Sequence, residues 1–176
     1  LRKLRPGVLV CEAPSRTFFD GILGRGGLAA RICNDLGCPI LFGKGAPSYK
    51  RLVFALLPGT RDLQLADTAI DLVRLLSLPL VLLQVSLPEY VEAPDSQTGQ
   101  LAVEIERRAR LYGLKTETQK VEGNPVRELL RLVTQTDLLL IGRRRALRDS
   151  FTSPDVALRV ARSAKGSVLV QTEERR

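Results

Sequence analysis

Asp155-Val-Ala-Leu-Arg-Val-Ala-Arg-Ser-Ala-Lys-Gly-Ser-Val-Leu-Val170 combines a helical apolar period with a closing apolar strand, and this pattern occurs twice. Gly27-Leu-Ala-Ala-Arg-Ile-Cys-Asn-Asp-Leu-Gly-Cys-Pro-Ile-Leu-Phe42 aligns with it without a gap. The identical pairs are Ala29 with Ala157, Arg31 with Arg159 and Leu41 with Leu169. An apolar run that ends in a polar loop precedes each copy, at residues 9–16 and 138–145. A repeated strand–loop–helix–strand unit predicts two related domains, the first present only as its final part.

Between the two copies, predicted strands and helices alternate. Short apolar runs bounded by turn residues indicate buried strands at 52–57, 80–85, 138–141 and 167–171. Residues 114–121 are far more polar and predict a strand at a sheet edge. Alternation of this kind implies right-handed crossovers. We therefore predict an α/β fold with a doubly wound parallel five-stranded sheet in the order 3-2-1-4-5.

Helices are predicted from apolar spacing and from capping residues. One apolar face comprises Ala66, Ala69, Ile70, Val73 and Leu76, and a second comprises Leu101, Ile105, Ala109 and Tyr112. Gly113 is a C-cap candidate for the second helix, and residues 88–99 before it are predicted to form a loop. Asn124-Pro125 and Ser153-Pro154 are typical of helix starts.

These elements define the predicted domains. Residues 1–46 supply strand four, helix four and strand five of one domain, residues 47–50 form a linker, residues 51–172 form a complete domain and residues 173–176 form a tail. Two strands and a helix bury too little apolar surface to fold alone. Together with the absence of Met, this indicates a piece of a longer polypeptide.

Composition excludes several functions. The chain has no His, which removes His-based catalytic triads and the commonest zinc sites. Cys11, Cys33 and Cys38 form no Cys-x-x-Cys pair and are expected to be free thiols in a reducing cytoplasm. The net charge is +8, but aromatic residues make up only 5% and are not interleaved with basic ones, so nucleic-acid binding is not predicted. No apolar run is long enough to span a bilayer.

The order and spacing of several motifs resemble the universal stress protein family. They are Val121-Glu-Gly-Asn-Pro125, Asp137-Leu-Leu-Leu-Ile-Gly142, Val156-Ala-Leu-Arg-Val160 and Ser167-Val-Leu-Val170. The resemblance covers residues 51–172 and, in part, residues 7–43. It implies pairing through strand five, which would place residues 39–43 beside residues 167–171, either within one chain or across a homodimer.

Members of that family that bind ATP use a Gly-x-x-Gly loop after strand four, followed nine residues later by Gly-Ser or Gly-Thr at a helix start. Glycines let backbone N–H groups approach phosphates, and the helix N-terminus favours negative charge. Here Gly142 is kept, but Arg145 replaces the second glycine and Pro154-Asp155 stands at the helix start. Leu57-Pro58 stands where the family has a strand-one Asp.

The first copy keeps the spacing from Arg16 to Gly26-Gly27, with Ala13 in place of its first glycine. The remaining candidate for anion binding is the arginine-rich loop after strand four. The candidate ligand-binding residues are therefore Gly142, Arg143, Arg145, Arg148, Gly26 and Gly27. Asp149 is a candidate partner that would neutralise these arginines, which would make the loop an ordinary solvated segment.

We therefore predict a non-catalytic regulatory or interaction domain of universal stress protein type, with a degenerate ATP site and no cofactor. The alternative is a nucleotide- or anion-binding sensor that uses ATP or another adenine nucleotide. Because similar tandem domains also form the cytoplasmic tails of transporters and ion exchangers, a membrane portion of the same polypeptide is a candidate partner. A catalytic α/β enzyme is disfavoured, since no paired acid, base and nucleophile are present.

Overall fold

The computed structural model describes residues 7–12, 38–45, 48–58, 63–88, 96–144 and 155–173. Its strands are β1 (Leu9–Glu12), β2 (Ile40–Gly43), β3 (Arg51–Leu56), β4 (Leu80–Ser86), β5 (Thr116–Glu122), β6 (Asp137–Arg144) and β7 (Ser167–Glu173). Its helices are α3 (Leu63–Leu76), α4 (Ser96–Leu111), α5 (Pro125–Leu132) and α6 (Val156–Ser163).

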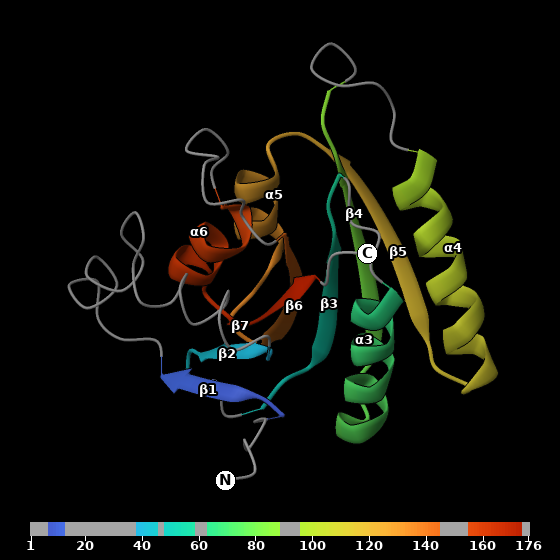
Figure 1. Ribbon diagram of the computed structural model, residues 1–176, viewed down its shortest axis with the longest axis horizontal. Coiled ribbons are helices and arrows are strands. Elements are labelled where there is room, and N and C mark those ends of the chain that lie inside the picture. The colour runs from blue at the N-terminus through green and yellow to red at the C-terminus, as the bar shows by residue number, and fades with distance from the viewer. Residues whose placement is uncertain are drawn as a thin grey trace, which may run out of the picture.

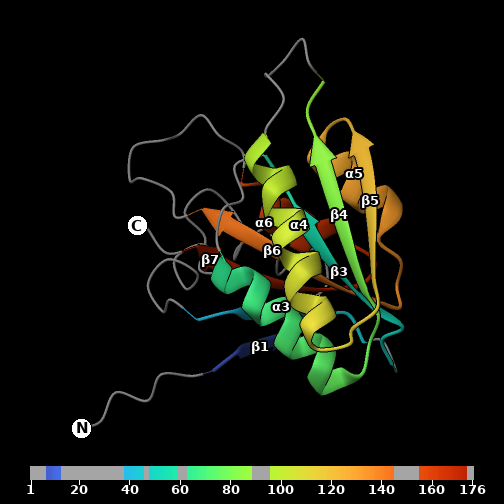
Figure 2. The ribbon, with the colours of Figure 1, turned by 90° about the vertical axis from the view of Figure 1, so that its right-hand side faces the viewer.

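The described strands form one sheet in the order β1-β2-β7-β6-β3-β4-β5. Neighbouring strands are parallel except for β2 and β7, which are antiparallel. Counted along the chain from β3, the last five strands lie in the order 3-2-1-4-5. Helices α5 and α6 lie on one side of the sheet, and α3 and α4 lie on the other (Figures 1 and 2). The predicted α/β class with a parallel-dominated sheet is confirmed.

Burial on both faces explains the continuous apolar strands. Val53 and Ala55 of β3 pack in the core beneath α5 and α6. Leu52, Phe54 and Leu56 alternate with them and pack beneath α3 and α4. A strand whose two faces are both covered needs apolar residues at every position, so the run has no polar alternation.

Helix boundaries follow the capping residues. Asn124 accepts a hydrogen bond from the Arg127 backbone N–H at 3.2 Å, which confirms the predicted start of α5. The predicted start of the last helix at Ser153-Pro154 was wrong, because Asp155 is the N-cap and α6 begins at Val156. The predicted loop was also too long, since α4 already begins at Ser96.

Two residues assigned to buried helix faces are exposed instead. Leu76 is 41% exposed and Tyr112 is 54% exposed, because both lie where a helix ends beyond the edge of the core. The Tyr112 ring lies 4.6 Å from the guanidinium carbon of Arg74, a cation–π contact between the ends of α3 and α4. Gly113 follows with φ of +66°, a left-handed conformation suited to glycine at a helix C-terminus.

A buried ion pair connects β3 and β6 at the amino end of the sheet. Asp137 is 1% exposed and accepts hydrogen bonds from Arg51 at 2.9 and 3.0 Å. It also accepts one from the Thr134 backbone N–H at 2.7 Å. The carboxylate is therefore satisfied on both oxygens, as a buried charge requires.

Candidate functional site

The candidate site lies at the carboxyl ends of β3 and β6. In doubly wound sheets, ligands bind where successive crossovers leave in opposite directions, and β3, with β4 on one side and β6 on the other, marks that position. The chain leaves β3 through Leu57 and Pro58, which have no carboxylate to hold a ribose. The Thr98 hydroxyl of α4 donates a hydrogen bond to the Leu57 carbonyl oxygen at 3.4 Å, which ties the end of β3 to α4.

An ion pair connects β6 to the start of α6 at this edge. Arg143 lies on β6 opposite Thr172 and is only 4% exposed. Its Nε donates a hydrogen bond to Oδ2 of Asp155 at 2.5 Å. The other carboxylate oxygen, Oδ1, accepts a hydrogen bond from the Leu158 backbone N–H at 3.1 Å. One carboxylate therefore neutralises the arginine and caps the helix.

This arrangement engages two of the donors that would attract a phosphate. A helix N-terminus offers unpaired N–H groups and a positive dipole end, and an arginine offers a charged hydrogen-bond donor. Asp155 already accepts from one donor of each kind, the Leu158 N–H and Arg143 Nε, and its negative charge repels an incoming anion. At this end of α6, the chain supplies its own carboxylate where a nucleotide-binding site would present donors to a phosphate.

The structure describes two of the six predicted ligand-binding residues. Gly142 lies on β6 opposite Gln171, and Arg143 follows it. Gly26, Gly27, Arg145 and Arg148 lie outside the described residues, as does Asp149. Sequence reasoning missed the pairing of Arg143 with Asp155. The available signal was an Asp immediately before an apolar helical period, which is a strong N-cap pattern.

The strand register corrects one equivalence in the first copy. Glu12 lies opposite Gly43, just as Gly142 lies opposite Gln171. Gly43 and Gln171 are equivalent in the repeat, so Glu12 stands in the place of Gly142. The prediction from the sequence placed Ala13 there, which is one residue later along the chain and lies outside the described residues.

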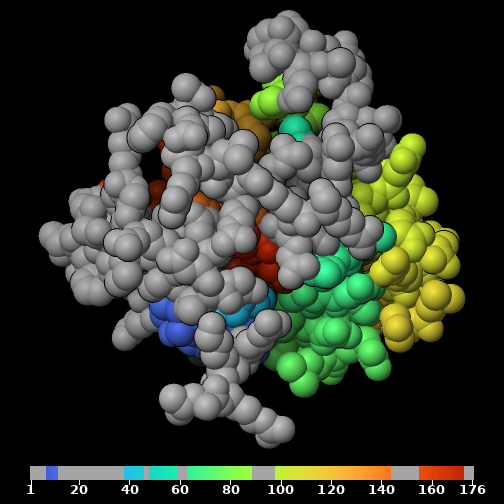
Figure 3. All heavy atoms as spheres, viewed as in Figure 1, coloured from blue at the N-terminus to red at the C-terminus, as the bar shows by residue number. Residues whose placement is uncertain are grey.

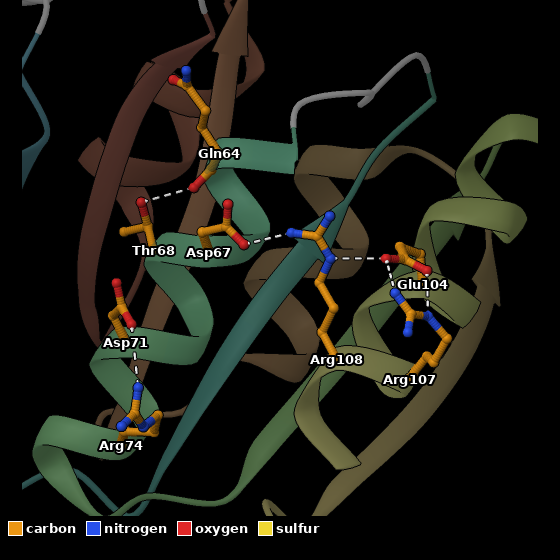
Figure 4. Close-up of polar contacts among 8 residues, drawn as sticks. All are labelled: Gln64, Asp67, Thr68, Asp71, Arg74, Glu104, Arg107 and Arg108. Carbon is orange, nitrogen blue, oxygen red and sulfur yellow. Dashed lines mark hydrogen bonds and ion pairs between the residues drawn. The ribbon is translucent and has the colours of Figure 1, made fainter. Parts of the chain in front are cut away.

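A separate group of charged residues joins α3 to α4 (Figure 4). Glu104 accepts hydrogen bonds from Arg107 and Arg108, each at 2.8 Å, and Arg108 also donates to Asp67 on α3 at 2.6 Å. The hydrogen bonds from Arg107 and Arg108 lower the pKa of Glu104 to about 2. Charges of both signs satisfy each other here, which indicates a link between helices and not a ligand site.

The described residues contain no group of three or more His, Cys, Asp or Glu that could hold a metal ion. Cys11 and Cys38 are free thiols, whereas Cys33 lies outside the described ranges. Burial raises the pKa of the Cys11 thiol, which disfavours the reactive thiolate. Of the helices that the structure describes, none is both long and apolar enough to cross a membrane.

The family model of the universal stress protein family matches residues 48–171, and the chain belongs to this family. A universal stress protein from Archaeoglobus fulgidus DSM 4304 has a similar structure, with a TM-score of 0.66 and 17% identity over 94% of this chain. The chain spans 60% of the length of that protein. No curated protein matches the chain.

Two further similar structures were solved with nucleotides. One is a universal stress protein in complex with cAMP, with a TM-score of 0.55 and 21% identity over 72% of this chain and 99% of that one. The other is the universal stress protein from Archaeoglobus fulgidus in complex with dAMP, with a TM-score of 0.51 and 16% identity over 70% of this chain and 98% of that one. At these identities the likeness establishes the fold alone.

Proposed function

We propose that the chain is a non-catalytic regulatory or interaction domain of universal stress protein type that works without a bound nucleotide. The observation that carries the proposal is the ion pair between Arg143 and Asp155. It closes the start of α6 to phosphate with a carboxylate of the chain itself. Leu57-Pro58 at the end of β3 supports the same conclusion, since neither of these two residues has a carboxylate for the adenosine part of a nucleotide.

A nucleotide- or anion-binding sensor is the second candidate. Similar structures carry cAMP and dAMP, and Arg143 lies at the sheet edge where ligands of this architecture bind. An anion that binds Nε of Arg143 would have to displace the Asp155 carboxylate. The further hypothesis of a transporter or exchanger tail rests on family resemblance alone.

We also propose the tandem arrangement, in which residues 1–46 belong to a second domain of the same type. The support is the internal repeat together with the placement of β1 and β2. They are a parallel pair, as β6 and β7 are, and they join the sheet through the antiparallel contact of β2 with β7. This contact lies within one chain, whereas pairing across a homodimer stays a prediction.

Isothermal titration calorimetry with Mg-ATP, AMP, cAMP and inorganic phosphate tests the proposed function. We expect no saturable heat, with any dissociation constant weaker than about 100 µM, or roughly −5.5 kcal/mol. A low-micromolar constant for a nucleotide would favour the sensor. Loss of that binding in an Arg143→Gln variant would then place the ligand at the carboxyl end of β6.

A further inference from the structure

One row of side chains crosses the whole sheet on the face where α3 and α4 lie. In register it consists of Val10, Leu41, Leu169, Leu140, Phe54, Leu82 and Thr118. The four central members, from Leu169 to Leu82, are at most 3% exposed, whereas Val10 at the end of the row is 67% exposed. The row is apolar from Leu82 to Val10. The central side chains are covered by other parts of the chain, whereas Val10 is left largely uncovered. Atoms of β1 are visible at the surface in Figure 3.

The pairing of β2 with β7 has the symmetry of the internal repeat. Leu41 lies opposite Leu169, its own counterpart in the repeat. The two flanking pairs, Ile40 with Val170 and Phe42 with Val168, exchange with each other under the repeat, because Ile40 corresponds to Val168 and Phe42 to Val170. A local pseudo-two-fold axis therefore passes between Leu41 and Leu169. It makes β1 the counterpart of β6 and Val10 the counterpart of Leu140.

On its side away from β7, β6 pairs in parallel with β3, where Phe54 lies opposite Leu140. The same two-fold rotation that relates β6 to β1 would place a strand equivalent to β3 on the outer side of β1. We infer that the outer edge of β1 is a docking edge for a parallel apolar strand followed by an amphipathic helix, with the chemistry of β3 and α3. The strand would place a large apolar residue opposite Val10, and the helix would cover Val8 and Val10. This inference rests on the proposed tandem arrangement.

The two outer strands of the sheet differ in a way that supports the inference. β5 carries Glu117, Lys120 and Glu122, and charges of this kind discourage further strands from adding to an edge. β1 carries only Glu12 at its last position, while Val8 is 45% exposed beside it. An apolar edge without such protection is suited to strand addition. A second copy of the chain is not a suitable donor, because its own β3 is already paired on both sides, with β4 and β6.

A binding experiment with the 176-residue chain tests this edge. The probe is a fluorescent peptide with the sequence of residues 50–76, which is the strand–helix unit that β6 already binds. The measurements are fluorescence anisotropy and amide hydrogen exchange at residues 9–12. We expect saturable binding that protects residues 9–12 and weakens at least about tenfold in Val10→Lys and in Val8→Lys. Leu75→Lys is the matched control, since Leu75 is 78% exposed on α3 and should leave binding unchanged.

Several results would overturn the inference. They are no binding, equal binding of a scrambled peptide, or equal binding by Val10→Lys and Val8→Lys. Self-association of the free chain that Val10→Lys abolishes would assign the edge to a second copy instead. Nucleotide titration does not report on β1. The docking inference can therefore be wrong while the proposed function is right, and the reverse also holds.

Discussion

Leu41 and Leu169 lie opposite each other in the antiparallel pairing of β2 with β7, and they are also equivalent residues of the internal repeat. A residue that faces its own counterpart marks a two-fold relation between the strands. Since Leu169 is 3% exposed in the core beneath α3 and α4, the contact extends that core toward β2. The β2–β7 contact therefore attaches β1 and β2 to the rest of the sheet.

The first prediction concerns this contact. Leu41→Asp should separate β2 from β7 because it places a charge opposite apolar Leu169. We expect a loss of about 1–3 kcal/mol in the stability of the contact. Hydrogen exchange should lose protection at residues 40–43 while residues 80–86 stay protected. Leu75→Asp on the exposed surface of α3 is the control, and unchanged protection at 40–43 in Leu41→Asp would contradict the prediction.

The order of elements could be predicted because each carries a local signal. β3 is continuously apolar since both its faces are buried, and Asn124-Pro125 defines the start of α5 by a cap that needs no distant partner. Helix ends were harder to predict. Leu76 continues the apolar period of α3, but the helix extends beyond the core at that point and leaves Leu76 exposed. Only the tertiary structure shows where the core ends.

The ion pair between Arg143 and Asp155 was harder to predict than the fold. Arg143 was a candidate anion ligand, and its partner Asp155 lies twelve residues further along the sequence. Several arginines and Asp149 offered competing pairs at similar spacing. The apolar periodicity does not show which arginine pairs with which carboxylate. That depends on which carboxylate lies near the end of β6 when α6 packs on the sheet.

The second prediction concerns the buried pair of Arg51 and Asp137. Asp137→Asn should destabilise the chain by about 2–3 kcal/mol, less than for a fully buried pair because the Arg51 side chain is 30% exposed. Burial raises the pKa of Asp137, but hydrogen bonds from Arg51 and Thr134 outweigh it, and the pKa lies below its ordinary value.

A lowered folded-state pKa has a defined sign for stability. The contribution of Asp137 is complete above the unfolded pKa, about 3.9, and is lost as the pH falls through the folded value. Urea unfolding between pH 2 and 7 should therefore show a steeper acid loss in the wild type than in Asp137→Asn. Parallel curves for the two proteins would refute this assignment.

The third prediction concerns Glu104 on α4. Its pKa of about 2 depends on hydrogen bonds from Arg107 and Arg108. Arg108→Gln removes one of these charges and the link to Asp67, so the pKa of Glu104 should rise toward its ordinary value. Carboxyl NMR titration measures this directly. Arg110→Gln is the control, because Arg110 pairs with Glu106, at 4.0 Å.

The fourth prediction concerns Gly166, which precedes β7. A Cβ at this position would meet the backbone oxygen of Thr134 and lie 2.7 Å from that of Asp137. Gly166→Ala should cost about 1–3 kcal/mol, since backbone must move to admit the methyl group. Gly7→Ala is the control, because nothing lies within 4 Å of its added Cβ. Equal unfolding midpoints for the two variants would disprove the close approach.

The fifth prediction tests whether Asp155 excludes anions. Asp155→Asn keeps a capping oxygen for the Leu158 N–H but removes the charge that pairs with Arg143. The variant should lose about 2–4 kcal/mol of stability, because buried Arg143 loses its carboxylate partner. Added inorganic phosphate should restore part of this loss, since an anion that binds only the folded state stabilises it.

The wild type is the comparison for that measurement. Its melting temperature should rise less with phosphate than that of Asp155→Asn, after correction for an equal ionic strength of chloride. Asp155→Ala separates the two roles of the side chain, because it removes the cap together with the charge and should be about 1 kcal/mol less stable than Asp155→Asn. If phosphate stabilises wild type and Asp155→Asn equally, the Asp155 carboxylate does not occupy an anion position, and the closed-site proposal loses its central support.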